Sequence, residues 1–137
     1  MDKLMGDLTD LLKTKLDLVN ESIKKEPEEM ELVYFEGVRM IYSGFLELIK
    51  SYSTSNVLQP DIEKRRSFLR FYANLYRGRW DKYAYDCGDN GAILKMYGER
   101  LYNKTRGRRD ACSDLYHELK KILEVIPDAK YKNELQK

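Results

Sequence analysis

Basic residues are concentrated in the middle of the sequence, where their side chains can bind anions. Thirteen of them fall between Lys64 and Arg109, and this stretch contains two Arg-Gly-Arg tripeptides, at 77–79 and 106–108. A guanidinium group binds phosphate through two parallel hydrogen bonds and also stacks on nucleic-acid bases. We therefore expect phosphate contacts from eight of these residues: Arg66, Arg70, Arg77, Arg79, Lys82, Arg106, Arg108 and Arg109.

Aromatic residues follow the first of these tripeptides at Trp80, Tyr83 and Tyr85. Aromatic rings stack on unpaired bases without regard to their identity. The glycines at 78 and 107 would let the backbone approach a phosphodiester closely. Together these residues predict that the partner is DNA or RNA, bound mainly through its phosphate backbone and with weak selectivity for sequence.

The net charge of +2 conceals an uneven distribution along the chain. Residues 1–61 carry a net charge of −5, residues 62–112 carry +7, and residues 113–137 are neutral overall. The basic segment has three possible roles that the sequence leaves open. It binds nucleic acid, it pairs with an acidic surface, or it is an ordinary solvated surface. The acidic surface belongs to the chain's own first half, a second copy, or a protein that this chain captures as an adaptor or inhibitor.

Catalytic and metal-binding patterns are weak throughout the sequence. The single histidine, His117, is predicted to be exposed, and no phosphate-binding loop or dinucleotide-binding motif is present. Residues 86–91, Asp-Cys-Gly-Asp-Asn-Gly, resemble the start of a calcium loop. However, Gly88 and Tyr97 occupy two positions that should supply ligands, so we expect a capped turn instead. We therefore predict a protein that is not an enzyme and that has no metal and no cofactor.

The cysteines and the N-terminus bear on the cellular compartment. Cys87 and Cys112 have no metal-ligand partners at suitable spacing, and the sequence allows either free thiols or a disulfide between them. No run of about 18 apolar residues is present, and Asp2, Asp7 and Asp10 interrupt the start of the chain. We expect no membrane partner and a cytoplasmic location, which is the host cytoplasm for a viral protein.

Apolar residues spaced by three or four predict an all-α fold, a single-domain bundle of about five helices over residues 1–137. Two acidic and apolar helices occupy 1–51 and offer a surface for self-association. The basic region, 62–112, holds a third helix ending near Arg77 and a fourth at 91–104. The C-terminal helix covers 110–126. A loop is expected at 51–61, where Pro60 and Asp61 signal the start of the next helix. Loops are also expected at the aromatic and glycine-rich segment 78–91 and at the second Arg-Gly-Arg, because glycine breaks helices.

Two features of the predicted helices concern packing. The buried side of the third helix is expected to contain Ile62, Phe68, Leu69, Phe71, Tyr72, Leu75 and Tyr76, with Arg66, Arg70, Asn74 and Arg77 along its edge. Gly37 and Gly44 lie seven residues apart on the second helix and therefore on one side of it. They either allow a neighbouring helix to approach closely or are simply tolerated.

Residues 68–102 resemble a C-terminal segment of phage and plasmid replication-associated proteins. In that segment a helix with spaced aromatic residues precedes a tyrosine-containing loop and a Gly-Asp helix start. The matching residues are Phe68, Tyr72, Tyr76, Tyr83, Gly88, Asp89, Ile93, Leu94 and Lys95. The N-terminal winged-helix domain of such initiators is replaced here by the two acidic helices. The resemblance implies a replication accessory role in a phage or mobile element, without direct recognition of an origin.

Overall fold

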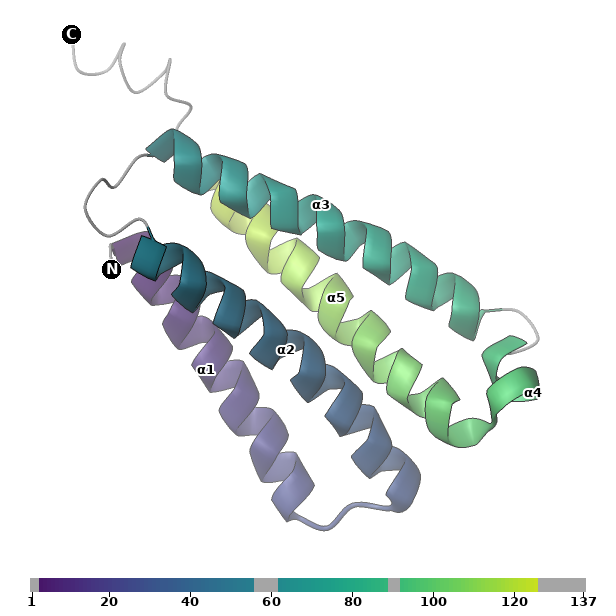
Figure 1. The fold of residues 1–137 in the computed structure, drawn as a ribbon. Coiled ribbons are helices and arrows are strands. Elements are labelled where there is room, and N and C mark those ends of the chain that lie inside the picture. Colours follow the sequence, from purple (N-terminus) through teal and green to yellow (C-terminus); the bar gives the residue numbers. More distant parts are fainter. Residues whose placement is uncertain (1–2, 56–61, 89–91, 126–137) are drawn as a thin grey trace, which may run out of the picture.

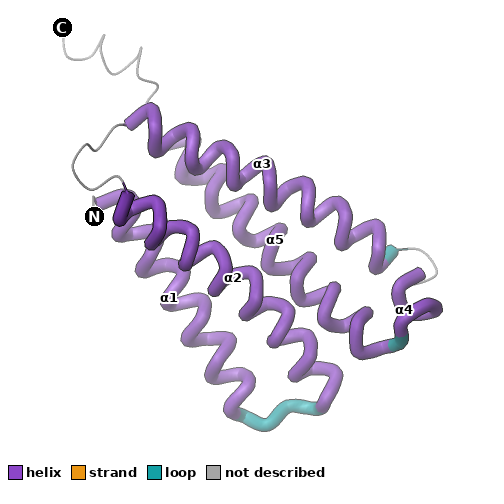
Figure 2. Tube along the Cα trace, in the orientation of Figure 1, coloured by secondary structure: helices purple, strands orange, loops and turns teal. Residues whose placement is uncertain are grey.

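The computed structural model describes residues 3–55, 62–88 and 92–125, and every regular element within these ranges is a helix (Figure 2). This confirms the predicted all-α bundle. The predicted loop at 51–61 begins later than expected, because residues 51–55 continue the second helix and 56–61 lie outside the described residues. The five helices are α1 (Lys3–Lys24), α2 (Glu29–Ser55), α3 (Ile62–Cys87), α4 (Ala92–Tyr97) and α5 (Glu99–Val125).

The four long helices are arranged around a central pair, α2 and α5 (Figure 1). Helix α1 runs antiparallel to α2, and α3 runs antiparallel to α5 on the other side. Helices α2 and α5 run in the same direction: Tyr34 contacts Asp110, and Tyr42, further along α2, contacts Asp114, further along α5. Because α2 packs against both α1 and α5, most of its circumference must be apolar, as its sequence is.

Aromatic side chains connect α2 to α3 in the core. Phe45 is fully buried, and its ring centroid lies 5.3 Å from that of Tyr76 and 5.6 Å from that of Tyr72. Aromatic pairs at such distances stabilise a core by roughly 0.5–1.5 kcal/mol beyond the area that they bury. Phe68 extends the cluster toward Tyr52, with 4.3 Å between their ring centroids. Leucine and methionine side chains from α1, α3 and α5 complete the core: Met5, Leu8, Leu12, Leu69, Leu115 and Leu119.

Two glycines set the close approach of α2 and α5. A Cβ atom added to Gly37 would collide with the backbone carbonyl oxygen of Lys104, and one added to Gly107 would collide with that of Tyr34. Each helix therefore needs a residue without a side chain where it crosses the other. Gly44, in contrast, faces open space. Of the two alternatives for the glycines of α2, Gly37 allows a neighbouring helix to approach closely, and Gly44 is simply tolerated.

The predicted loop at 78–91 is wrong over most of its length, because α3 continues without a break through Gly78 to Cys87. Glycine inside a helix costs only about 1 kcal/mol relative to alanine, and packing of the following turns offsets that cost. The inward side chains continue at helical spacing through the segment: Leu69, Ala73, Tyr76, Trp80, Tyr83 and Cys87.

The predicted turn at the second Arg-Gly-Arg is also wrong, because residues 104–109 lie inside α5. The break comes earlier, at Gly98, which separates the six-residue α4 from α5 and has a φ of +91°. Glycine adopts this left-handed backbone conformation without the steric cost that a side chain adds. The N–H of Gly98 donates a hydrogen bond of 3.0 Å to the carbonyl oxygen of Leu94, which ends α4.

Candidate nucleic-acid interface

The side of α3 that points away from the bundle carries exposed basic and aromatic side chains. We call this surface the outer face of α3 and define it by Lys64, Arg70, Phe71, Gly78, Lys82 and Tyr85. Residues spaced by three, four or seven along a helix share a face, so the core-facing positions from Leu69 to Cys87 leave these residues directed outward or to the flank. Among the residues that the structure describes, the three cations of this face take part in no ion pair: Lys64, Arg70 and Lys82.

Phe71 lies on the opposite side of α3 from the one predicted. It is 61% exposed, although the sequence places it among the buried residues of the helix. Its ring is held edge-on against Tyr72, with 5.0 Å between centroids and an interplanar angle of 82°. Phe71 is therefore an exposed aromatic side chain with a defined orientation. The signal that identifies it is the helical spacing through Gly78, because that spacing fixes which side of α3 is buried.

Trp80 and Tyr83, which the sequence predicts as stacking residues, are partly buried against the core. The ring of Trp80 lies 6.1 Å from that of Tyr116 and 5.5 Å from that of His117, so it packs between α3 and α5. Tyr85, the third predicted stacking residue, is 84% exposed. Of the three, the structure leaves Tyr85 accessible on the outside of α3.

The arginines of the first Arg-Gly-Arg are exposed and lie over aromatic rings. Arg77 pairs with Asp81, with 3.6 Å between Nε and the carboxylate, and its guanidinium lies 5.1 Å from the ring centroid of Trp80. The guanidinium of Arg79 lies 5.7 Å from the ring centroid of Tyr76. Both side chains remain accessible. An exposed ion pair of this kind contributes little to stability, so its arginine can readily exchange the carboxylate for another anion.

The arginines of the second Arg-Gly-Arg are partly buried in contacts within the bundle. Arg106 donates a hydrogen bond of 3.0 Å to the Asn103 side chain, and its guanidinium lies 5.5 Å from the ring centroid of Tyr34. Arg109, which follows the tripeptide, pairs with Asp110 at 3.0 Å. Within the described chain, the Nε of Arg108 is buried and has no hydrogen-bond partner.

The basic residues predicted to bind phosphate therefore divide into two groups by exposure. One group lies fully on the surface of α3: Arg70, Arg77, Arg79 and Lys82. The other group is partly buried: Arg66, Arg106, Arg108 and Arg109. A phosphate group reaches the first group without any rearrangement of the helices. The accessible basic surface is consequently narrower than the sequence suggests, and it belongs mainly to one helix.

The two Arg-Gly-Arg tripeptides act on a common buried group, Cys112. Burial raises the pKa of the Cys112 thiol to about 12, and the positive charges of Arg79 and Arg108 oppose that increase. Cys87 is also buried, and burial likewise raises the pKa of its thiol. Both cysteines are free thiols, which decides the alternative that the sequence left open. Buried thiols with raised pKa values are poor nucleophiles.

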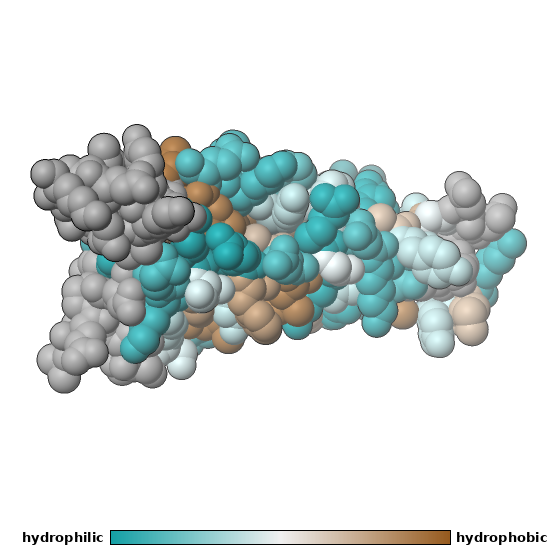
Figure 3. All heavy atoms as spheres, turned by 90° about the horizontal axis from the view of Figure 1, so that it is seen from above, coloured by the Kyte–Doolittle hydropathy of each residue, from teal (hydrophilic) through white to brown (hydrophobic). Residues whose placement is uncertain are grey.

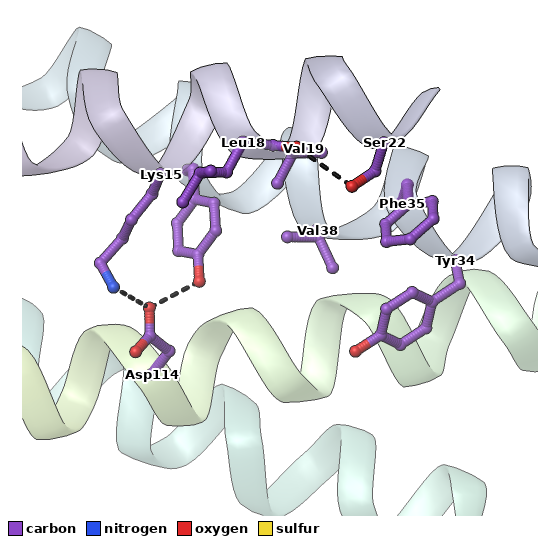
Figure 4. Close-up of a pocket in the computed structure, with 9 residues that line it drawn as sticks. Lys15, Leu18, Val19, Ser22, Tyr34, Phe35, Val38 and Asp114 are labelled. Carbon is purple, nitrogen blue, oxygen red and sulfur yellow. Dashed lines mark hydrogen bonds and ion pairs between the residues drawn. The ribbon is translucent and has the colours of Figure 1, made fainter. Parts of the chain in front are cut away.

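A hollow lies on another side of the molecule, between α1, α2 and α5 (Figure 4). It is a groove of about 360 Å³, and apolar side chains such as Val19, Phe35 and Val38 form much of its lining. At one end Asp114 accepts hydrogen bonds from the Tyr42 hydroxyl at 2.5 Å and the Lys15 ammonium at 2.8 Å. The contact between Lys15 and Asp114 links α1 to α5, although 99 positions separate the two residues in the sequence.

The polar groups of this groove stabilise one another. Burial and the hydrogen bond to Asp114 raise the pKa of Tyr42 far above its ordinary value. Burial and the hydrogen bond to Asp110 raise the pKa of Tyr34 to about 12. Both phenols are therefore neutral hydrogen-bond donors at physiological pH, and each carboxylate has a fixed partner. Such pairs hold helices in register, which is a different arrangement from a base placed beside an activated nucleophile.

The remaining sequence patterns are accounted for individually. His117 is exposed, as its helical position predicts, and its Nδ1 lies 2.7 Å from the Ser113 carbonyl oxygen. Within the described ranges there is no cluster of three or more His, Cys, Asp or Glu side chains suited to a metal. Residues 89–91 of the calcium-loop-like segment lie outside the described residues.

Hydrophilic side chains cover most of the face seen from above, with hydrophobic patches between them (Figure 3). Of the helices in the described part of the chain, none combines the length and the apolar character needed to cross a membrane. Comparisons with protein-family models, with curated proteins and with solved structures found no match for this chain. The resemblance of residues 68–102 to replication-associated proteins therefore stays a prediction from the sequence.

Proposed function

We propose that this protein is a non-enzymatic nucleic-acid-associated accessory protein that binds the phosphate backbone mainly through α3. The observation that supports this proposal is the set of exposed cations on the outer face of α3, which pair with no acid among the described residues. Helix α3 contains seven basic and three acidic residues. A phosphate backbone carries a regular row of negative charges, which a basic surface attracts independently of sequence.

The length of α3 favours contact with several phosphates. Its 26 residues extend over about 39 Å at 1.5 Å per residue, and cations occur from Lys64 near one end to Lys82 near the other. The charges are distributed along the helix instead of being gathered at its tip. A helix that reads bases usually inserts its N-terminal residues into the major groove. We therefore expect binding along the side of α3 with little preference for sequence.

A salt series tests this proposal directly. Fluorescence anisotropy of a labelled 20-nucleotide DNA or RNA is measured with the wild type between 50 and 300 mM salt. We expect log affinity to fall linearly with log salt, by about 0.7 to 0.9 for each phosphate contacted. The triple variant Lys64→Glu, Arg70→Glu, Lys82→Glu should bind weakly at every salt concentration and with a smaller slope.

The matched control reverses three exposed lysines on α1: Lys3→Glu, Lys13→Glu and Lys24→Glu. This variant has the same net charge as the α3 variant, so a general charge effect would weaken both equally. Loss of affinity in the α3 variant alone supports binding through α3. If the wild type binds no oligonucleotide at low salt, the proposal is wrong.

An adaptor or inhibitor that captures another protein is the second candidate. The specific observation in its favour is the groove of Figure 4, beside which Leu18 is 60% exposed. An amphipathic helix of a partner binds such an apolar groove through side chains spaced by three and four. In this case the cations of α3 would attract an acidic partner, and a stoichiometric complex would form without any affinity for oligonucleotides. The salt series separates the two candidates.

A further inference from the structure

Two exposed aromatic rings lie on the outer face of α3 with a glycine midway between them. Phe71 is 61% exposed and Tyr85 is 84% exposed, and Gly78 is seven residues from each. Positions seven apart differ by only about 20° around a helix, so the three residues share one side. The two rings are separated by about 21 Å along the helix axis, at 1.5 Å per residue.

The residues between the rings are mainly polar. Asn74, Asp81 and Lys82 are exposed on or beside this stripe, and a Cβ atom added to Gly78 would meet no atom within 4 Å. A partner helix of a protein requires a continuous apolar stripe with residues spaced by three and four. This face offers isolated rings in polar and basic surroundings. Such an arrangement suits a ligand whose flat groups are separate from one another and are attached to a charged backbone.

We propose that the outer face of α3 binds single-stranded nucleic acid, with bases stacked on Phe71 and Tyr85 and phosphates neutralised by Lys64, Arg70 and Lys82. This inference rests on the proposed function and specifies the class of nucleic acid that is bound. The positive charge of the face complements the phosphates, and every base has a π-face on which an aromatic ring can stack. The exposed position of Gly78 leaves room for the strand to approach the helix between the two rings.

A duplex cannot use the two rings in the same way. Its bases are stacked on one another, and a ring on a protein surface reaches their faces only after the stack opens, which costs a few kcal/mol. In a single strand the bases turn outward freely. At about 3.4 Å per nucleotide, the spacing of stacked bases, the distance between the rings corresponds to at most roughly six nucleotides, and a more extended strand spans it with fewer. A 12-nucleotide strand is therefore long enough to contact both rings.

The experiment compares a 12-nucleotide unstructured strand with a 12-base-pair duplex at 100 mM salt. The test variant is Phe71→Leu, Tyr85→Leu, which removes both rings and keeps residues that favour helices. The control variant is Tyr97→Leu, which removes an exposed tyrosine, 64% accessible, that belongs to α4 and not to the outer face of α3. Circular dichroism establishes that both variants retain the helical content of the wild type.

We expect the wild type to prefer the single strand and the test variant to bind it about tenfold more weakly for each ring removed. The salt dependence should be unchanged, because the phosphate contacts remain, and the control should bind as the wild type does. Restoring one ring as Phe71→Trp, Tyr85→Leu should recover part of the affinity.

Three outcomes would overturn the inference. Equal affinity for strand and duplex, unaffected by the loss of both rings, would leave phosphate binding through α3 intact and remove the stacking. Absence of binding to any oligonucleotide would remove both the inference and the proposed function. Conversion of a dimer to a monomer by Phe71→Leu, Tyr85→Leu, detected by sedimentation, would assign the rings to contact with a second copy of the chain.

Discussion

The two Arg-Gly-Arg tripeptides have the same sequence, and both lie inside long helices, yet their surroundings are opposite. Gly78, in α3, faces open space, and the arginines on either side of it are exposed. Gly107, in α5, is buried against the backbone of α2, and its flanking arginines are partly buried. Their roles follow from the helix that carries them. On the edge helix α3 the tripeptide forms part of a surface, and on the central helix α5 it allows close packing.

The largest expected effect comes from adding one methyl group to each of these glycines. In Gly107→Ala the new Cβ collides with the Tyr34 carbonyl oxygen, which belongs to a backbone that cannot turn aside. We expect a loss of about 3 kcal/mol in the free energy of unfolding, at the upper end for overpacking. Urea denaturation followed by circular dichroism measures this loss as a lower midpoint.

The matched variant Gly78→Ala should change stability in the opposite direction. Because the position is helical and open, alanine should stabilise the protein by roughly 0.5–1 kcal/mol. Similar losses from both substitutions would contradict the structural distinction between the tripeptides. Similar gains would mean that α2 and α5 lie further apart than described here.

The second test uses Cys112, which both tripeptides influence. Its pKa is raised to about 12 in the folded protein from an ordinary value of 9.0, chiefly by burial. The thiol therefore contributes no pH dependence below about pH 8. Above pH 9 the unfolded chain loses this proton while the folded chain retains it, so stability should fall as pH rises toward 12.

We expect Cys112→Ala to remove this contribution. Between pH 9 and 10.5, the free energy of unfolding of the wild type should fall more steeply than that of the variant. The difference should be about 0.7 kcal/mol per pH unit at pH 9, where half of the unfolded thiols are ionised, and should approach about 1.4 at the upper end of this range, since one proton is involved. Most of the contribution of the buried tyrosines cancels between the two proteins, and the remainder comes from Tyr76, whose raised pKa owes a smaller part to the charge of Cys112. Parallel pH profiles would show that Cys112 ionises as freely in the folded state as in the unfolded chain.

The smallest test compares one arginine from each region. Arg106→Ala removes the contact with the Tyr34 ring and the hydrogen bond to Asn103, and should cost about 1 kcal/mol of stability. Arg70→Ala, on the outer face of α3, should change stability by less than about 0.5 kcal/mol. For oligonucleotide affinity the order should reverse, because Arg70 is the accessible cation. If Arg106→Ala lowers affinity more than Arg70→Ala does, the interface extends onto α5.

The helical fold follows from the sequence because apolar spacing persists across most of the chain, and the wrongly predicted helix breaks lie at glycines. Gly78 and Gly107 were interpreted as helix breaks, but inward residues such as Tyr76, Trp80 and Tyr83 continue the period through the first of them. Gly98, the actual break, was missed. A single sequence shows that glycine permits a left-handed conformation, and it does not show which glycine adopts one.

The candidate site was only partly predictable. The exposure of Arg70 follows from its predicted position on the third helix, whereas Lys82, predicted in a loop, is exposed on α3. Trp80 was expected to stack on bases and instead packs between two helices, because the loop that would have freed it does not form. The groove between α1, α2 and α5 is lined in part by the pair of Lys15 and Asp114, and helical periodicity contains no information about pairs so distant in the sequence.

The parallel arrangement of α2 and α5 has a consequence for the order of assembly during synthesis. The contacts between this central pair join residues more than 70 positions apart: Tyr34 with Asp110 and Tyr42 with Asp114. The ribosome releases α1 and α2 long before α5 exists, at about 5–20 residues per second. For several seconds the nascent chain therefore presents the glycine-containing side of α2 without its native cover, until α5, the last of the described helices to emerge, packs against it.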